Sequence, residues 1–355
     1  MISLGSDNHS GIHPDLLNAM LEVNADSAAS YGQDPWSQKL KKRCAELFKA
    51  ADSFLVFNGT AANVLCLQAS LKSYESALVT DIAHLHVDEC GAPEKTVGCK
   101  IIPVKSFHGK FIFENLVSHI ERQGDQHFSQ VKVISVTQPT EYGTLYSVEE
   151  LKAIKALCRQ HSLFLHIDGA RFANAAQAMD LSLSELADFA DILSFGGTKN
   201  GMLAGELVVI RKPELTKGFR FYRKQFLQLP SKTRFFAAPF LRYLQDDLWK
   251  DIAAHENQRA QELRQLIELH TELEITQPTQ ANSVFFKIPR AWLKPLRKKF
   301  FFYVWNENTF EVRIMMSFDT TSEHLQDFVA EIKKIASDPN TESLPPRSQP
   351  SKERP

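Results

Sequence analysis

The sequence predicts an α/β protein with a mainly parallel central sheet, followed by a smaller α+β domain. Short apolar runs recur as far as residue 210, and plausible helices lie between several of them. Apolar strands that alternate with helices are typical of a parallel sheet. From about residue 213 the pattern changes to long helical segments and then to short strands.

In the first part of the chain we expect helices over residues 13–28 and 34–50. The second opens with Asp34 and Pro35, a good N-cap and first-turn pair. Residues 53–57 read as a buried strand, and "NGTAANVLCLQASL" as a tight turn that opens a helix. Ser147-Val148-Glu149-Glu150 fits a capping box at the start of another helix. Further strands are expected at residues 76–80, 100–104, 131–136, 163–168 and 191–195.

The strand at residues 205–210 follows its predecessor too closely for a helical crossover, so we expect it to pair antiparallel. Helical segments then cover residues 214–271, the strands "SVFFKI", "FFYVW" and "EVRIMM" follow, and a last helix lies near 322–337. The final polar, proline-rich stretch has nothing to bury and is expected to be disordered. We therefore expect a large α/β domain (1–230), a small α+β domain (231–337) and a disordered tail (338–355).

Composition narrows the class of protein. The chain has 355 residues, 41 basic and 42 acidic side chains and a net charge of -1, so no excess of charge indicates binding to nucleic acid or to a membrane. No apolar run approaches the roughly 18 residues of a membrane span, and the N-terminus lacks the pattern of a signal peptide. The five cysteines are odd in number and form no Cys-x-x-Cys pair, which favours a reducing compartment. We expect a cytoplasmic protein.

Unusual polar residues follow three of the expected strands, at the sheet edge where ligands of α/β proteins gather. Asn58-Gly59-Thr60 precedes a helix, whose first backbone amides could hold a phosphate, although a plain turn also fits. Asp168 closes the strand in "HIDGAR". It could cap a helix, bind a metal or hold a proton on a ring nitrogen, with Arg171 near an anionic oxygen.

Lys199, in "DILSFGGTKNGM", lies among Gly196, Gly197 and Gly201. It could be a solvated residue of a surface turn, or a nucleophile that forms a Schiff base with a carbonyl. We interpret the glycines as allowing a cofactor to approach closely. A phosphate cradle, a ring-nitrogen aspartate and a Schiff-base lysine are the three groups that pyridoxal phosphate needs, and their combination predicts that cofactor.

The chain resembles the L-threonine aldolase family of pyridoxal-phosphate enzymes, in particular its low-specificity and phenylserine-aldolase-like branch. The resemblance implies an aspartate-aminotransferase-like fold (fold type I) and a homodimer or homotetramer. Where many threonine aldolases carry an Asn-Thr-His stretch, this chain has "TQPTEYG", so the preferred aldehyde stays open. The matching segments are "SDNHSGIHP", "YGQDPW", "FNGTAANVL", "AHLHVDECGAPE", "TQPTEYGTLY", "LHIDGARFANA", "SFGGTKNGM" and "VRIMMSFDT".

The resemblance assigns five residues to the cofactor. Lys199 would form the Schiff base, and Asp168 would be the partner of the pyridine nitrogen. Gly59 and Thr60 would hold the phosphate. Arg171 would lie against the phenolate oxygen of the cofactor or the carboxylate of the substrate.

Other residues are assigned to the substrate and to catalysis. His84 would stack on the cofactor ring, and His127 would face the substrate side chain, although a histidine in so polar a stretch is most often a surface residue. Arg313, helped by Ser6, would bind the amino acid carboxylate. A charge in an apolar strand needs such a partner. His84 and His86 are spaced like two metal ligands on a strand, but no third ligand stands out, so no metal is expected.

The implied reaction is the retro-aldol cleavage of a β-hydroxy-α-amino acid to glycine and an aldehyde, with His84, His127 or a water as the base. The same scaffold also supports transamination, racemisation and β-elimination. A β-eliminating lyase or aminotransferase, and a pyridoxal-phosphate-binding protein without turnover, therefore remain alternatives.

Overall fold

The computed structural model describes residues 1–338, which form two compact units. The larger unit is Gly11–Ala254, and the smaller combines Met1–Ser10 with the chain from His255 onwards. This division differs from the one expected from the sequence, because residues 231–254 join the larger unit and the first ten residues join the smaller. Apart from Asp338, the predicted disordered tail lies outside the described residues.

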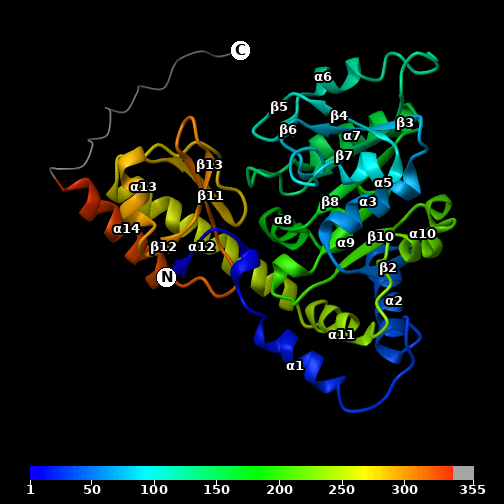
Figure 1. Ribbon diagram of the computed structural model, residues 1–355, viewed down its shortest axis with the longest axis horizontal. Coiled ribbons are helices and arrows are strands. Elements are labelled where there is room, and N and C mark those ends of the chain that lie inside the picture. Colours follow the sequence, from blue (N-terminus) through cyan, green and yellow to red (C-terminus); the bar gives the residue numbers. More distant parts are fainter. Residues whose placement is uncertain (339–355) are drawn as a thin grey trace. The chain divides into compact units, whose positions relative to one another are not determined.

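A seven-stranded sheet forms the centre of the larger unit, in the order β2-β10-β9-β8-β7-β3-β4 (Figure 1). All neighbouring pairs run parallel except the two made by β10, which is antiparallel to both β2 and β9. The predicted mainly parallel sheet and its antiparallel strand are confirmed. The strands are β2 (Asp52–Val56), β3 (Glu75–Thr80), β4 (Lys100–Val104), β7 (Gln130–Thr137), β8 (Phe164–Gly169), β9 (Ile192–Gly196) and β10 (Glu206–Ile210).

The central strands are buried along their whole length because helices cover both faces of a parallel sheet. All five residues of β9 and all five of β10 are buried. Polar side chains nevertheless lie inside these strands, among them His166, Ser194 and Glu206. Buried polar groups need hydrogen-bond partners, and theirs lie at the site described below.

Helices of varied length connect the strands. The capping box predicted at Ser147 and Glu150 is present at the start of α7. The expected helix over 13–28 ends at Glu22. The helices of this unit are α1 (Pro14–Glu22), α2 (Pro35–Phe48), α3 (Gly59–Ser70), α4 (His84–Val87), α5 (Ala92–Val97), α6 (Phe113–Ser118), α7 (Val148–Gln160), α8 (Phe172–Ala178), α9 (Leu183–Ala187), α10 (Phe219–Gln225) and α11 (Arg234–Tyr243), with the 3-10 turns η2 (Thr198–Asn200) and η3 (Pro213–Thr216) and a small hairpin of β5 (Ser106–Phe107) and β6 (Lys110–Phe111).

The helical stretch expected over 214–271 is divided into η3, α10, α11 and α12 (Leu248–His270). The interruptions coincide with left-handed backbone at Gly218, Leu227, Asp246 and Asp247, a conformation that a helix cannot contain. Helix α11 packs against α1 and α2 (Figure 1). The boundary between the two units falls within α12.

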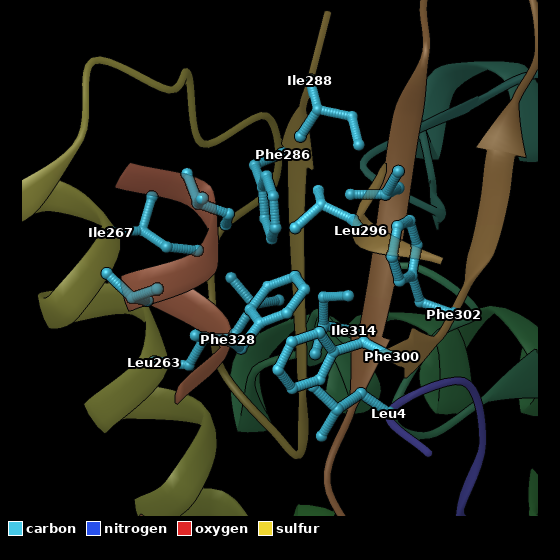
Figure 2. Packing of buried hydrophobic residues seen from close by; sticks show 14 of the residues in the cluster. Leu4, Leu263, Ile267, Phe286, Ile288, Leu296, Phe300, Phe302, Ile314 and Phe328 are labelled. Carbon is cyan, nitrogen blue, oxygen red and sulfur yellow. The ribbon is translucent and has the colours of Figure 1, made fainter. Parts of the chain in front are cut away.

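The smaller unit is an α+β structure, as predicted. An antiparallel sheet has the order β11-β14-β13, and the N-terminal strand β1 pairs with β12. Aromatic side chains fill the core, where Phe286, Phe300, Phe302 and Phe328 gather among leucines and isoleucines (Figure 2). The elements are β1 (Ile2–Ser3), η1 (Asp7–His9), β11 (Ser283–Lys287), α13 (Arg290–Leu296), β12 (Phe300–Phe301), β13 (Tyr303–Asn306), β14 (Glu311–Met315) and α14 (Ser322–Ala336).

Among the described residues, no helix combines the length and the hydropathy that crossing a membrane requires.

Candidate active site

Three neighbouring parallel strands end at the same edge of the large sheet. In the register of β7, β8 and β9, Asp168 lies between Thr137 on one side and Ser194 on the other. Lys199 is in the 3-10 turn η2, three residues after the end of β9. As the sequence predicted, Asp168 lies at the end of one strand and Lys199 follows the next strand along the chain; the structure shows that these two strands are neighbours in the sheet.

The glycines around Lys199 have a different role from the one the sequence suggested. A Cβ on Gly196 would lie 2.2 Å from the carbonyl oxygen of Ala170, and one on Gly197 would lie 2.4 Å from that of Gly205. Gly201 ends η2 in the left-handed region, at φ +84°. Close packing against the protein's own backbone thus explains Gly196 and Gly197, and the left-handed backbone explains Gly201, which corrects the interpretation that these glycines admit a cofactor.

A buried glutamate holds the lysine loop. Oε2 of Glu206, the first residue of β10, accepts the backbone N–H of Gly197 at 2.7 Å, and the Glu206 carboxylate also accepts the hydroxyl of Thr198. Because β10 is antiparallel, its first residue lies at the edge where β9 and β2 end. Burial raises the pKa of Glu206 to about 7, while its hydrogen bonds and the charge of Lys199 oppose that rise.

Asp168 is buried and held from two directions. Its Oδ1 accepts the backbone N–H of Ala170 at 3.1 Å, and its Oδ2 accepts the side-chain amide of Asn63 at 2.7 Å. Asn63 belongs to α3, so this hydrogen bond fixes the start of that helix beside the strand end. A carboxylate buried in this way at a strand end is suited to pair with a cationic nitrogen.

The N-terminus of α3 provides open backbone amides. Asn58 caps the helix, its Oδ1 accepting the N–H of Ala61 at 2.9 Å. Gly59 and Thr60 form the first turn and are half-buried. A Cβ on Gly59 would meet no atom within 4 Å, so the packing of the protein does not demand glycine there. The space in front of this turn is open to an anion, which helix N-termini favour.

His84 lies in the short helix α4 and not in a strand, which corrects the expected pairing with His86 on one face. Its ring Nδ1 is 2.9 Å from Oε1 of Glu89, and its backbone N–H donates to Oε1 of Glu141 at 2.9 Å. The hydrogen bond to Glu89 raises the pKa of His84, against the opposing effects of burial and of the charge on Lys199. His86 is exposed, and residues 1–338 contain no cluster of three or more side chains able to hold a metal ion.

Arg171 lies three residues after Asp168, at the N-cap position of α8, and is half-buried. The larger unit therefore brings together six of the residues that the sequence singled out. They are Gly59, Thr60, His84, Asp168, Arg171 and Lys199.

Within the smaller unit, Arg313 and Ser6 belong to one neighbourhood. Arg313 lies in the middle of β14, and its Nη2 donates to the carbonyl oxygen of Gly5, next to Ser6, at 3.4 Å. The guanidinium carbon lies 4.8 Å from the centre of the Trp305 ring. Ser6 caps η1 by accepting the backbone N–H of Asn8. The arginine is therefore held by an aromatic face and a backbone carbonyl beside a serine hydroxyl.

The structure separates His127 from the other predicted residues of the larger unit. It is exposed and precedes β7, whereas Asp168 lies beside the last residue of that strand. Eight residues of extended chain span about 25 Å. His127 lines a surface cavity of about 440 Å³ with Lys100 and Arg122. Within one chain it does not face the Lys199 cluster.

Several residues of the cluster were not found from the sequence. The sequence marks each of them only as a polar residue in or near an apolar helix or strand. That mark does not reveal which residue it contacts in the fold. They are Asn63, Glu89, Glu141, His166, Ser194 and Glu206.

Comparison with known proteins identifies the family. The model of the beta-eliminating lyase family matches residues 3–290. The chain is 38% identical over 338 residues to the low specificity L-threonine aldolase of Pseudomonas aeruginosa, covering 93% of this chain and 96% of that protein. It is also 38% identical over 340 residues to the low specificity L-threonine aldolase of a Pseudomonas species, covering 94% and 97%.

Solved structures agree with this assignment. The threonine aldolase of Leishmania major has a TM-score of 0.89 and 28% identity, covering 94% of this chain and 99% of that one. An aspartate aminotransferase of Thermus thermophilus, at 16% identity, has a TM-score of 0.69 over 94% of this chain and 91% of its own. The fold is therefore the aspartate-aminotransferase-like fold of pyridoxal-phosphate enzymes, fold type I. The chain belongs to the beta-eliminating lyase family and, within it, to the threonine aldolases, as the sequence motifs predicted. Enzymes of this family depend on pyridoxal phosphate.

Proposed function

We propose that this protein is a low-specificity L-threonine aldolase, a lyase of amino acid metabolism. It cleaves L-threonine, L-allo-threonine or related β-hydroxy-α-amino acids such as phenylserine to glycine and an aldehyde. The observation that carries the proposal is the placement of Asp168 and Lys199 at the ends of two adjacent parallel strands, in a chain 38% identical to two such aldolases.

The residues of the larger unit fit pyridoxal phosphate. The open first turn of α3, at Gly59 and Thr60, suits the phosphate, and the buried carboxylate of Asp168 suits the pyridine nitrogen. Lys199 would bind the aldehyde carbon, and Arg171 would neutralise an oxygen of the cofactor or substrate. When bound, the cofactor supplies an electron sink for the bond that breaks at Cα.

The chain's own residues then have distinct tasks. Arg313 and Ser6 bind the carboxylate of the amino acid, and this orients the Cα–Cβ bond. Because Nδ1 of His84 donates to Glu89, its Nε2 is the nitrogen that can take the proton from the β-hydroxyl group. Glu206 fixes the lysine loop through Gly197 and Thr198.

The direct test is aldehyde release from L-allo-threonine by protein incubated with pyridoxal phosphate. We expect glycine and acetaldehyde in equal amounts, and a visible absorption band of the bound cofactor. Lys199→Ala should lose both the band and the turnover. Lys42→Ala, which changes an exposed lysine of α2, should retain both.

Other outcomes select the alternatives. Keto acid formation without release of ammonia would indicate an aminotransferase, whereas a keto acid released together with ammonia would indicate β-elimination. A cofactor band without turnover on any amino acid would indicate a binding protein. Normal turnover by Lys199→Ala would remove the central assignment.

Two further parts of the proposal rest on the family resemblance and on composition. We propose that the protein self-associates as a homodimer or homotetramer, which light scattering during gel filtration would test. A cytoplasmic location stays a prediction from the composition and the cysteine count.

A further inference from the structure

Asn63 occupies an unusual position between two acidic side chains. It is 3% exposed, and its Nδ2 donates to Oδ2 of Asp168 at 2.7 Å and to Oε1 of Glu89 at 2.9 Å. An amide nitrogen carries two hydrogens, so each carboxylate takes one of them. The same oxygen of Glu89 accepts from the ring of His84. Asn63 therefore links Asp168 to the Glu89–His84 pair through hydrogen bonds.

The far side of Asn63 fixes which way its amide points. Its Oδ1 accepts the hydroxyl of Ser194 at 2.5 Å. The opposite orientation would place the amide oxygen against two carboxylates and would be repulsive. Because Ser194 donates to Asn63, the Oγ of Ser194 must accept from Nε2 of His166, 3.2 Å away.

The remaining hydrogen bond then has only one direction. With Nε2 of His166 protonated, its Nδ1 accepts the hydroxyl of Ser135 at 2.8 Å. This requires a neutral imidazole, and burial lowers the pKa of His166 to about 4. Every donor in the row thus points toward the two acids. In order, the row is Ser135, His166, Ser194 and Asn63, and it ends on Asp168 and Glu89.

Glu89 depends on this arrangement. Its side chain is fully buried, and its Oε2 has no hydrogen-bond partner among the described residues. Burial raises the pKa of Glu89, and the hydrogen bonds from His84 and Asn63 oppose that rise. Removing the amide of Asn63 would take away one of the two groups that stabilise the charged carboxylate.

We propose that Asn63 is a positioning residue that couples the Glu89–His84 pair to Asp168, so that the state of the histidine depends on a residue it does not touch. The inference rests on the proposed function for its catalytic meaning, since His84 is the proposed proton acceptor. The coupling itself is a property of the protein without cofactor or substrate.

The charged groups around His84 set the expected direction of its titration. These charged groups lie in or directly after four different elements. The row of hydrogen bonds that runs through Asn63 ends on two of them, Glu89 and Asp168. If Asn63 is lost, the charge on Glu89 is less stabilised, so Glu89 becomes a stronger base for the imidazolium and the pKa of His84 should rise. The groups are Glu89 after α4, Glu141 after β7, Asp168 in β8 and Lys199 in η2.

The experiment measures the pKa of His84 by NMR in cofactor-free protein labelled at histidine, with the His84→Gln variant used to assign the signal. Glu89→Gln should lower that pKa by about one unit or more, because the charged acceptor is lost. Asn63→Ala should raise it by about half a unit, because Glu89 and Asp168 each lose a hydrogen bond that stabilises their charge. The matched control is Asn282→Ala, another buried asparagine whose amide donates to a carboxylate, that of Asp7, and it should leave the pKa of His84 unchanged.

An unchanged pKa of His84 in folded Asn63→Ala would overturn the coupling. If that variant does not fold, Ser194→Ala tests the same row, since it frees the amide of Asn63; an unchanged pKa there would again overturn the proposal. A shifted pKa in a protein that fails to cleave β-hydroxy amino acids would leave the coupling standing and remove the proposed function. The two failures are therefore distinguishable.

Discussion

At the scale of single residues, glycines of this chain differ in what surrounds the position of a Cβ atom. Gly196 and Gly197 are glycine because a neighbouring carbonyl oxygen occupies the place of their Cβ atoms. Gly59 has open space at the same position. The packing of the fold therefore requires glycine at positions 196 and 197. The open space beside Gly59 leaves room for a ligand.

Gly196→Ala should destabilise the protein by about 3 kcal/mol or more, because the backbone must move to relieve the clash with Ala170. Gly11→Ala is the control, since its Cβ would meet nothing within 4 Å, and it should change stability by no more than about 0.5 kcal/mol. Unfolding in urea measures both. Equal stability of the two variants would contradict the packing argument.

The raised pKa of Glu141 leads us to expect that the stability of the folded protein depends on pH. Burial raises its pKa from 4.5 to about 7, so the folded protein keeps a proton that the unfolded chain releases between these values. The stabilising contribution is complete below pH 4.5 and is lost as the pH rises through about 7. Glu141→Gln cannot ionise and should remove this loss, which is at most about 3 kcal/mol.

The measurement is the melting temperature of cofactor-free protein between pH 5 and pH 8. The melting temperature of Glu141→Gln should fall less over this pH range than that of the unmodified protein. Glu149→Gln, which changes an exposed glutamate in the first turn of α7, should follow the unmodified protein. Identical slopes for all three would show that Glu141 does not titrate in this range.

At the scale of elements, helix α3 serves the site twice. Its first turn presents open amides, and Asn63, one turn further on, holds Asp168. Because both features belong to one helix, the hydrogen bond from Asn63 also fixes the position of the first turn relative to Asp168. The cap at Asn58 fixes where this helix begins.

Asn58→Ala should cost about 1 kcal/mol of stability, because the N–H of Ala61 loses its acceptor. It should also weaken the binding of pyridoxal phosphate several-fold, as the first turn frays. Ser147→Ala removes the cap of α7 and should cost a similar amount of stability while leaving cofactor affinity unchanged. Equal cofactor affinities in the two variants would argue against a phosphate at α3.

At the scale of the whole molecule, the proposed roles divide between the two units. The residues proposed to bind the cofactor all lie within Gly11–Ala254, whereas Ser6 and Arg313 belong to the smaller unit. Cofactor binding and carboxylate binding should therefore be separable by mutation.

Arg313→Ala should raise KM for the amino acid roughly ten- to a hundredfold, the value of a hydrogen-bonded charge, and should leave the affinity for pyridoxal phosphate unchanged. Arg290→Ala, an exposed arginine at the start of α13, should change neither. Steady-state kinetics and a cofactor titration decide the matter. Weakened cofactor binding in Arg313→Ala would contradict the division.

How far the sequence sufficed also depends on scale. Apolar runs in the sequence predict the strands, and the polar residues that end these runs identify Asp168 and Lys199. Both signals are local patterns. The helical conformation of His84 and the pairing of β1 were missed, because four residues and two residues are too few for periodicity to appear. The partners of Asn63 lie 26 and 105 residues away, so only the folded register brings them together.

The antiparallel direction of β10 also bears on how the site assembles. Strands β9 and β10 form a hairpin, and Lys199 lies in the loop that joins them. The lysine and the glutamate that holds its loop are therefore brought together by closing one short segment, which costs little chain entropy. Asp168 and Asn63 meet only after distant segments have joined. We expect the lysine loop to be native-like earlier in folding than the acidic cluster beside it, as local contacts generally are.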